Sequence, residues 1–123
     1  MEQEKLINIV NDLAKQPNES EWVEFKHNYH SAEEIGERIS ALANGACLHN
    51  QPFGYLVEGN EDKTHKILGT TFNIKSAKKG KEDIESWLIN RLEPKIDFRT
   101  HCFEYKEGIN ISLALFYTKN SKL

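Results

Sequence analysis

The stretch that decides the fold of this chain runs from residue 19 to residue 62, and three short runs define it. The first, in which polar and apolar residues alternate as in a β-strand, is Glu19-Ser20-Glu21-Trp22-Val23-Glu24-Phe25-Lys26. The second, with the spacing of an amphipathic helix, is Ile39-Ser40-Ala41-Leu42-Ala43-Asn44. The third, an apolar strand that ends in a polar turn, is Gly54-Tyr55-Leu56-Val57-Glu58-Gly59-Asn60-Glu61-Asp62. The stretch therefore predicts strand, helix and strand, with carboxylates near the strand ends.

The helix between the two strands has a clear start and a clear apolar face. Ser31 followed by Glu34 matches a capping box, in which the serine side chain accepts a bond from a backbone N–H group of the first turn. Apolar residues then recur three or four positions apart, so one stripe of this helix should face a sheet. Gly45 lies where a glycine commonly ends a helix.

The remaining elements follow from hydrophobic spacing and from turn residues. The polar turn at Gly59–Lys63 predicts that two strands pair as an antiparallel hairpin. We expect helices at 1–15 and 82–92, the hairpin strands at 53–58 and 65–71, and a last strand pair at 99–105 and 109–117. This order (helix, strand, helix, two strands, helix, two strands) predicts an α+β fold, a two-layer domain with helices packed on a mixed or antiparallel sheet.

Length and composition limit the class of protein. The 123 residues suit one domain, with 38% hydrophobic and 28% charged residues, which is ordinary for a globular chain. We expect no membrane partner, because no apolar run reaches the roughly 18 residues of a membrane helix. Cys47 and Cys102 are too few for a disulfide framework, so we expect them to be reduced in a cytoplasmic protein.

Charge is distributed unevenly along the chain. The formal net charge is −3, and residues 1–62 hold 12 acidic residues against 4 basic ones. The next segment holds six lysines and no acid: Lys63, Lys66, Lys75, Lys78, Lys79 and Lys81. Clustered lysines can contact phosphates and release counterions, which gives affinity without sequence readout. We therefore predict that these six lysines bind nucleic acid.

The three runs quoted above also resemble a known family, the Schlafen-type AlbA-like domain, whose members are described as DNA-binding. Its bacterial members occur at the N-terminus of transcriptional-regulator-like proteins. The resemblance covers roughly residues 17–117, which form the family domain, and residues 118–123 are then a tail that leads to further domains. The helix predicted within residues 1–16 is a cap on this domain or, alternatively, a docking surface for a partner. The chain departs from the family pattern at Asn60, where many members carry Val, and in the longer loop between Gly45 and Gly54.

The resemblance also implies candidate catalytic residues, because animal Schlafen proteins include RNA endonucleases that use three carboxylates. Glu19 and Glu24 match the first two, and Glu61 or Asp62 matches the third. Converging carboxylates can hold Mg²⁺ or Mn²⁺, and in that case we expect Glu19, Glu24 and Asp62 as ligands. Lys26, on the strand face of Glu24, would neutralise the phosphate. The alternative is that these acids are solvated surface residues, and then no cofactor is expected.

The sequence thus predicts a nucleic-acid-binding domain, with DNA or RNA as partner, rather than an enzyme. A metal-dependent endoribonuclease is the first alternative. The second is a protein-interaction module that forms a homodimer through its last strand pair or its first helix.

Overall fold

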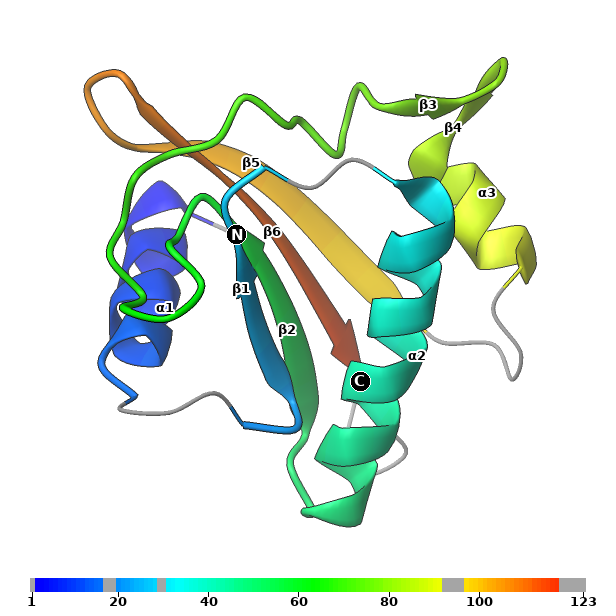
Figure 1. Cartoon of the computed structure of the whole chain (residues 1–123), viewed down its shortest axis with the longest axis horizontal. Coiled ribbons are helices and arrows are strands. Elements are labelled where there is room, and N and C mark those ends of the chain that lie inside the picture. Colours follow the sequence, from blue (N-terminus) through cyan, green and yellow to red (C-terminus); the bar gives the residue numbers. More distant parts are fainter. Residues whose placement is uncertain (1, 17–19, 29–30, 92–96, 118–123) are drawn as a thin grey trace.

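The computed structural model describes residues 2–16, 20–28, 31–91 and 97–117. The helices are α1 (Gln3–Ala14), α2 (Ala32–Leu48) and α3 (Ile84–Arg91). The strands are β1 (Val23–Lys26), β2 (Phe53–Glu58), β3 (Lys78–Lys79), β4 (Glu82–Asp83), β5 (Phe98–Lys106) and β6 (Ile109–Tyr117). This confirms the predicted α+β class, with helices packed on a mixed sheet (Figure 1).

The main sheet has the strand order β1-β2-β6-β5. β1 and β2 are parallel and α2 connects them, whereas β6 runs antiparallel to both β2 and β5. The short strands β3 and β4 pair only with each other, beside α3. No helix in the described residues is long and apolar enough to cross a bilayer.

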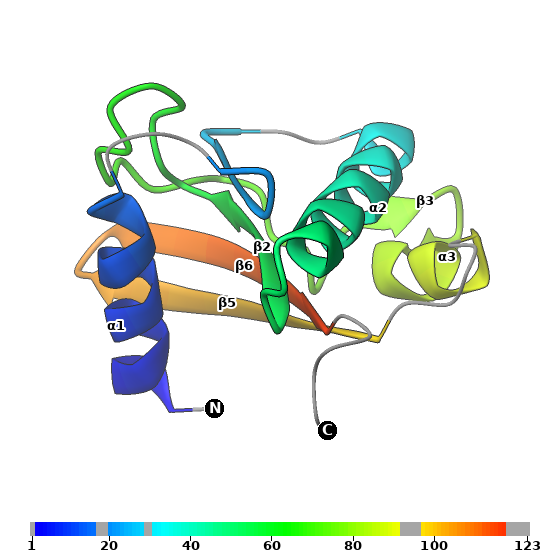
Figure 2. The same ribbon diagram turned by 90° about the horizontal axis from the view of Figure 1, so that it is seen from below.

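Alternation along the strands sends side chains to two apolar clusters, one on each face of the sheet. α2 and α3 cover one face, where Ile35, Ile39 and Leu88 pack against Leu56 and Phe116. α1 covers the other face, so that the sheet lies between helices (Figure 2). There Leu6 and Val10, which are 4% and 0% exposed, join a cluster of strand residues made of Val23, Phe25, Val57, Ile111, Leu113 and Leu115. The first helix is therefore an integral cover of the sheet.

The helix start predicted at Ser31 is confirmed, because its Oγ accepts a bond from Glu34 N at 3.3 Å. The predicted helix end at Gly45 is wrong, since α2 continues to Leu48 and Asn50 takes the left-handed conformation instead (φ 56°). Gly45 has another role: a Cβ at this position would lie 2.1 Å from Glu21 O. The glycine therefore lets α2 approach the backbone that leads into β1.

The predicted hairpin between residues 53–58 and 65–71 is also wrong. β2 already pairs with β1 on one side and with β6 on the other, so it has no free edge for a third strand. The residues after β2 form instead a long irregular segment, with one isolated bridge between Asn60 and Ile67. His65, with φ 63°, is 4% exposed and lies against Phe25, their ring centroids 4.2 Å apart.

Side chains from β6 and from the residues just after β1 hold the second half of this irregular segment, residues 69–77, across the top of the molecule (Figure 1). Asn28 Oδ1 accepts bonds from Thr70 Oγ1 at 2.6 Å and from Thr71 N at 2.9 Å. Ser112 Oγ on β6 donates to Phe72 O at 2.8 Å, and this serine is buried. These bonds fix the segment that leads to β3. We call residues 69–77 the strap.

Candidate nucleic-acid interface

Among the described residues, the predicted acidic residues, Glu24 on β1 and Glu61 and Asp62 in the turn after β2, do not form a cluster that could hold a metal ion. On β1, Val23 and Phe25 face the α1 side, so Glu24 and Lys26 face α2. Glu24 Oε2 lies 3.3 Å from Arg38 Nε of α2, and the side chains of the two residues are 14% and 48% exposed. They line an open groove of about 340 Å³ between β1 and α2. The contact lacks hydrogen-bond geometry, so this oxygen has no hydrogen-bond partner among the described residues.

Lys26 connects β1 to the turn after β2. Its Nζ lies 3.8 Å from Asp62 Oδ2, and the Asp62 side chain is 52% exposed. Lys26 and Asp62, both predicted site residues, are thus brought together, next to Glu24 on the same strand face.

Glu61, by contrast, is committed to its own turn. Its Oε2 accepts bonds from Lys63 N at 2.7 Å, Thr64 N at 2.5 Å and Thr64 Oγ1 at 2.9 Å. The bonds from Thr64 are the main reason why the pKa of this carboxyl lies below its usual range. Donors that stabilise a carboxylate in this way lower its pKa and fix its orientation. Asp62 is therefore better placed than Glu61 to serve as a third carboxylate.

A metal centre would need more ligands than these residues supply. Across the described ranges, no three His, Cys, Asp or Glu side chains come together as a metal site. Glu24 and Asp62 each have a basic partner, and Glu19 lies outside the described residues. Without Glu19, the described residues do not complete a site for Mg²⁺ or Mn²⁺, and the three-carboxylate site stays a prediction.

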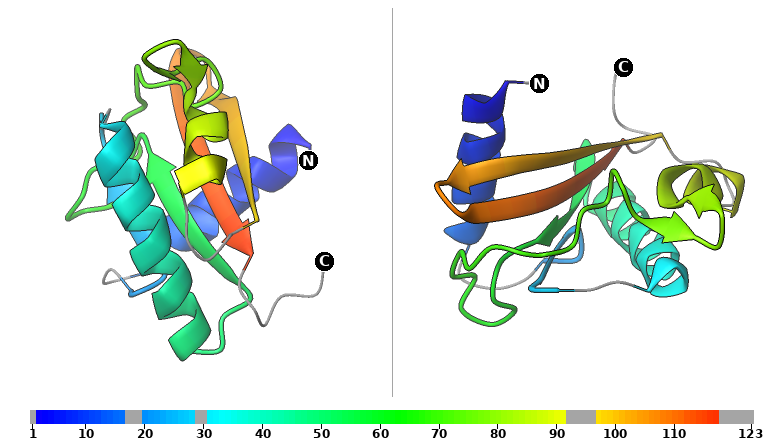
Figure 3. Two further views of the ribbon diagram at one scale, coloured as in Figure 1. Left: turned by 90° about the vertical axis from the view of Figure 1, so that its right-hand side faces the viewer. Right: turned by 90° about the horizontal axis from the view of Figure 1, so that it is seen from above.

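The six lysines form two groups rather than one surface. Lys63 and Lys66 belong to the loop after β2, beside α1, whereas Lys75, Lys78, Lys79 and Lys81 belong to the strap and the β3–β4 hairpin, near α3. Figure 1 and the right-hand view of Figure 3 place these two regions at opposite ends of the long axis.

Three lysines of the hairpin group make ion pairs with neighbouring acids. Lys78 Nζ lies 2.6 Å from Asp83 Oδ1, and Lys79 Nζ lies 2.5 Å from Glu33 Oε1 at the start of α2. Lys75 Nζ lies 3.4 Å from Glu85 Oε1. All three lysine side chains are 43–57% exposed, and exposed pairs of this kind contribute at most about 1 kcal/mol each. A phosphate group can therefore compete for these lysines.

One residue of the site was missed by the sequence reasoning. Glu58, at the end of β2, lies directly opposite Lys26 in the parallel ladder and is 2% exposed. Neither of its carboxylate oxygens has a hydrogen-bond partner in the described part of the chain. Burial raises its pKa to about 8, and the positive charge of Lys26 opposes this shift. The signal was present in the sequence, because residues 54, 56 and 58 share one face of the predicted strand.

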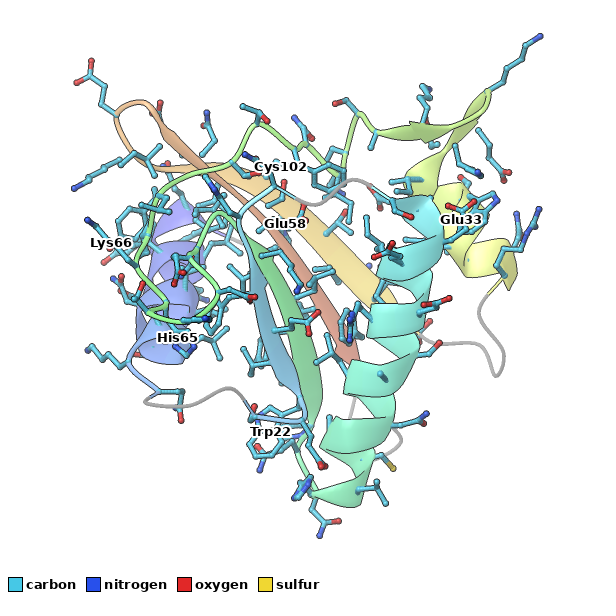
Figure 4. The ribbon with its side chains drawn as sticks, viewed as in Figure 1. Trp22, Glu33, Glu58, His65, Lys66 and Cys102 are labelled. Atoms are coloured by element: carbon cyan, nitrogen blue, oxygen red, sulfur yellow. The ribbon has the colours of Figure 1, made fainter. Side chains whose placement is uncertain are left out.

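The buried Glu58 lies centrally between the two lysine groups. In Figure 4 it is located between Lys66 at one end and Glu33, the partner of Lys79, at the other. Lys26, its neighbour in the sheet, contacts the loop of Lys63 and Lys66 through Asp62. Lys26 thus connects β1 to the loop after β2, and Asn28, two residues further on, connects the chain to the strap.

The similarity of the chain to known proteins rests on a family model and on solved structures. No curated protein matches the chain. Among solved structures, it is similar to the DIP2311 protein from Corynebacterium diphtheriae, at 22% sequence identity and a TM-score of 0.42. The match covers 94% of this chain and 26% of that protein, so the chain spans about a quarter of its length. The model of the Schlafen AlbA_2 family matches residues 19–123, and the chain therefore belongs to this family, which points to a nucleic-acid-binding or related function.

Proposed function

We propose that this domain binds the phosphate backbone of DNA or RNA, as a cytoplasmic module of a bacterial regulator-like protein. The observation that carries the proposal is the β3–β4 hairpin with the end of the strap, where four lysines occur within residues 75–81. The acid partners of Lys78 and Lys79 are more than half exposed, and that of Lys75 is 30% exposed, so all three are weakly held. Lysines of this kind supply charge but no base readout, so binding should be independent of sequence and sensitive to salt.

The loop that carries Lys63 and Lys66 offers a second contact. Among the described residues, neither lysine makes an ion pair, and Lys26 pairs with Asp62 of the same loop. A strand of nucleic acid that runs from this loop to the β3–β4 hairpin would meet basic groups at both ends. Glu24 and Asp62, which lie beside Lys26, limit the affinity, because unscreened carboxylates repel phosphate within about one Debye length.

The test is a mobility shift with single- and double-stranded DNA and RNA at two salt concentrations. The double variant Lys78→Glu with Lys79→Glu should lose binding. Lys5→Glu with Lys15→Glu makes the same change of charge at exposed positions at the ends of α1 and should retain it. Equal loss in both double variants would show that only net charge matters and would contradict the proposal.

A second candidate, metal-dependent RNA cleavage, is favoured by one specific contact. Lys26 and Asp62 come together beside Glu24, as a carboxylate site near a phosphate-binding lysine requires. RNA cleavage that needs Mn²⁺ should then be lost in Glu24→Ala and in Asp62→Asn. Glu61→Gln should keep the activity, because the Glu61 side chain is used within its own turn. Cleavage that persists in Glu24→Ala would eliminate this candidate.

Self-association as a homodimer is the third candidate, and the edge strand β5 supports it. Nothing in that candidate depends on nucleic-acid binding.

A further inference from the structure

An open groove of about 250 Å³ lies between the first half of α2 and α3, at the end of the molecule that carries the β3–β4 hairpin (Figures 1 and 3). One wall is a stripe of α2 formed by residues 33, 36, 37 and 40, which recur at helical spacing. The other wall is formed by Trp87, Leu88 and Arg91 of α3. The groove and the lysines of the hairpin are therefore neighbours.

Gly36 determines how closely the two walls approach. A Cβ at this position would lie 3.3 Å from Leu88 Cδ2 and 4.0 Å from Trp87 Cζ3. Because glycine has no side chain, α3 packs close to α2 here, and an edge of the indole ring faces the α2 backbone. Trp87 packs against the core cluster on this side of the sheet but is only partly buried. The indole ring is thus held in place by the core and also lines the groove.

Arg91 lies over the face of this ring, with its Cζ 5.3 Å from the ring centroid. The arginine is exposed, at the last position of α3. A cation–π contact at an exposed site is weaker than the stacking of a nucleic-acid base on an aromatic side chain. A base can therefore replace the guanidinium group on the ring of Trp87. The displaced guanidinium group can then bind a phosphate group of the same strand.

The α2 wall of the groove carries two carboxylates, Glu33 and Glu37. Glu33 Oε1 lies 2.5 Å from Lys79 Nζ, and the hydrogen bond from this lysine holds the pKa of Glu33 below its usual range. Carboxylates repel a phosphate group, but they accept hydrogen bonds from the exocyclic amino groups of bases. The groove therefore suits a flat, neutral group with N–H donors, whereas Lys79 beside it suits a phosphate group.

We propose that this groove takes one unpaired base of the nucleic acid whose phosphates are bound by Lys78 and Lys79, with the base stacked on Trp87. The inference rests on the proposed function and adds to it a preference for single-stranded over double-stranded nucleic acid. In a duplex, the bases are paired and stacked on one another. Only a single strand or an unpaired end can present the face of a base to an aromatic side chain.

Tryptophan fluorescence tests the proposal in a Trp22→Phe variant, where Trp87 is the only tryptophan of the chain. Titration with single-stranded DNA or RNA should quench the emission of Trp87, and a duplex of the same length should quench it much less. Single strands that bind but leave this emission unchanged would overturn the proposal. Quenching by a basic peptide, but not by an oligonucleotide, would assign the groove to a protein partner and would also overturn it.

Substitutions in α3 locate the stacked base, with affinity measured by fluorescence anisotropy of labelled oligonucleotides. Trp87→Leu keeps an apolar contact with the core, and it should weaken single-strand binding about tenfold while leaving duplex binding unchanged. Trp87→Phe keeps an aromatic ring and should retain most of the single-strand affinity. Ile89→Ala removes a large side chain from the same helix, at a residue that is 52% exposed and outside the groove, and should change neither affinity.

Two results distinguish a failure of this inference from a failure of the proposed function. A wild-type chain that binds single strands and duplexes equally well, or single-strand binding that is unchanged in Trp87→Leu, would overturn this inference alone. A wild-type chain that binds neither form would contradict the proposed function and this inference together.

Discussion

Lys26 on β1 lies directly opposite Glu58 on β2, and the carboxyl group of Glu58 is buried in the sheet without a hydrogen-bond donor among the described residues. A buried carboxyl group in this position favours its neutral form, because burial destabilises the charged form more than a single neighbouring lysine stabilises it. Its pKa is accordingly raised from 4.5 to about 8. A proton is therefore held in the folded state at neutral pH, whereas the unfolded chain releases it.

This proton predicts how stability depends on pH. Between pH 4.5 and about 8, the folded state binds more protons than the unfolded state. The protonated Glu58 therefore contributes fully to stability below pH 4.5, and this contribution is lost as the pH rises to about 8. The slope should reach up to about 1.4 kcal/mol per pH unit. Urea unfolding at several pH values should show stability falling in this window, and Glu58→Gln should remove the fall.

A second titratable group changes stability in the opposite direction. The pKa of His101 is lowered, mainly by burial. The contribution of this histidine to the stability of the fold therefore grows as pH rises towards the pKa of an ordinary histidine. The difference between the wild-type chain and Glu58→Gln isolates the carboxyl group. Glu34→Gln, at an exposed position of α2, should keep the wild-type profile. A wild-type profile in Glu58→Gln would show that this carboxyl is ionised in the folded protein.

Local sequence patterns predicted most of the fold, but they did not predict which strands pair with β2. Helix caps and apolar spacing placed α1, α2 and the β5–β6 pair closely, because each depends on residues near in sequence. The hairpin after Glu58 was predicted wrongly because the turn signal at Gly59 is local. The partners of β2 are set by distant residues of β1 and β6. Glu58 was overlooked although it shares a strand face with the buried Leu56, because an acidic side chain at the end of a strand is usually exposed.

The two helical glycines of α2 should respond in opposite ways to substitution. Gly→Ala inside a helix normally stabilises it by about 1 kcal/mol. At Gly36 the added Cβ would lie 3.3 Å from Leu88 Cδ2, a flexible side-chain end, so Gly36→Ala should be close to neutral or stabilising. At Gly45 the added Cβ would clash with the backbone oxygen of Glu21. Gly45→Ala should therefore destabilise the fold by about 1–3 kcal/mol. Thermal unfolding of the two variants measures the difference, and equal effects would contradict the close approach of α2 to residue 21.

The bond from Ser112 to the strap should be important for stability. Ser112 Oγ donates to Phe72 O at 2.8 Å in a buried environment. Ser112→Ala would leave that carbonyl without this donor, at a cost of about 1–3 kcal/mol. Ser40→Ala, on the surface of α2, should change stability little, because alanine favours helix. Chemical unfolding provides the comparison. A loss in Ser112→Ala below a few tenths of a kcal/mol would mean that another donor replaces the hydroxyl.

The separation of the two lysine groups makes a prediction about how nucleic acid lies on the domain. Suppose that a long strand of nucleic acid contacts both lysine groups. The double variants Lys63→Gln with Lys66→Gln and Lys78→Gln with Lys79→Gln should then each weaken binding. The combined variant should lose the sum of the two binding free energies, because distant sites act additively. Each lost phosphate contact should reduce the slope of log K against log salt by about 0.7–0.9. A short oligonucleotide, which cannot reach both ends, should respond to only one pair. Fluorescence anisotropy with long and short oligonucleotides at several salt concentrations distinguishes these cases. If the affinity for a long oligonucleotide does not change in the Lys63 and Lys66 double variant, the interface is confined to the β3–β4 hairpin.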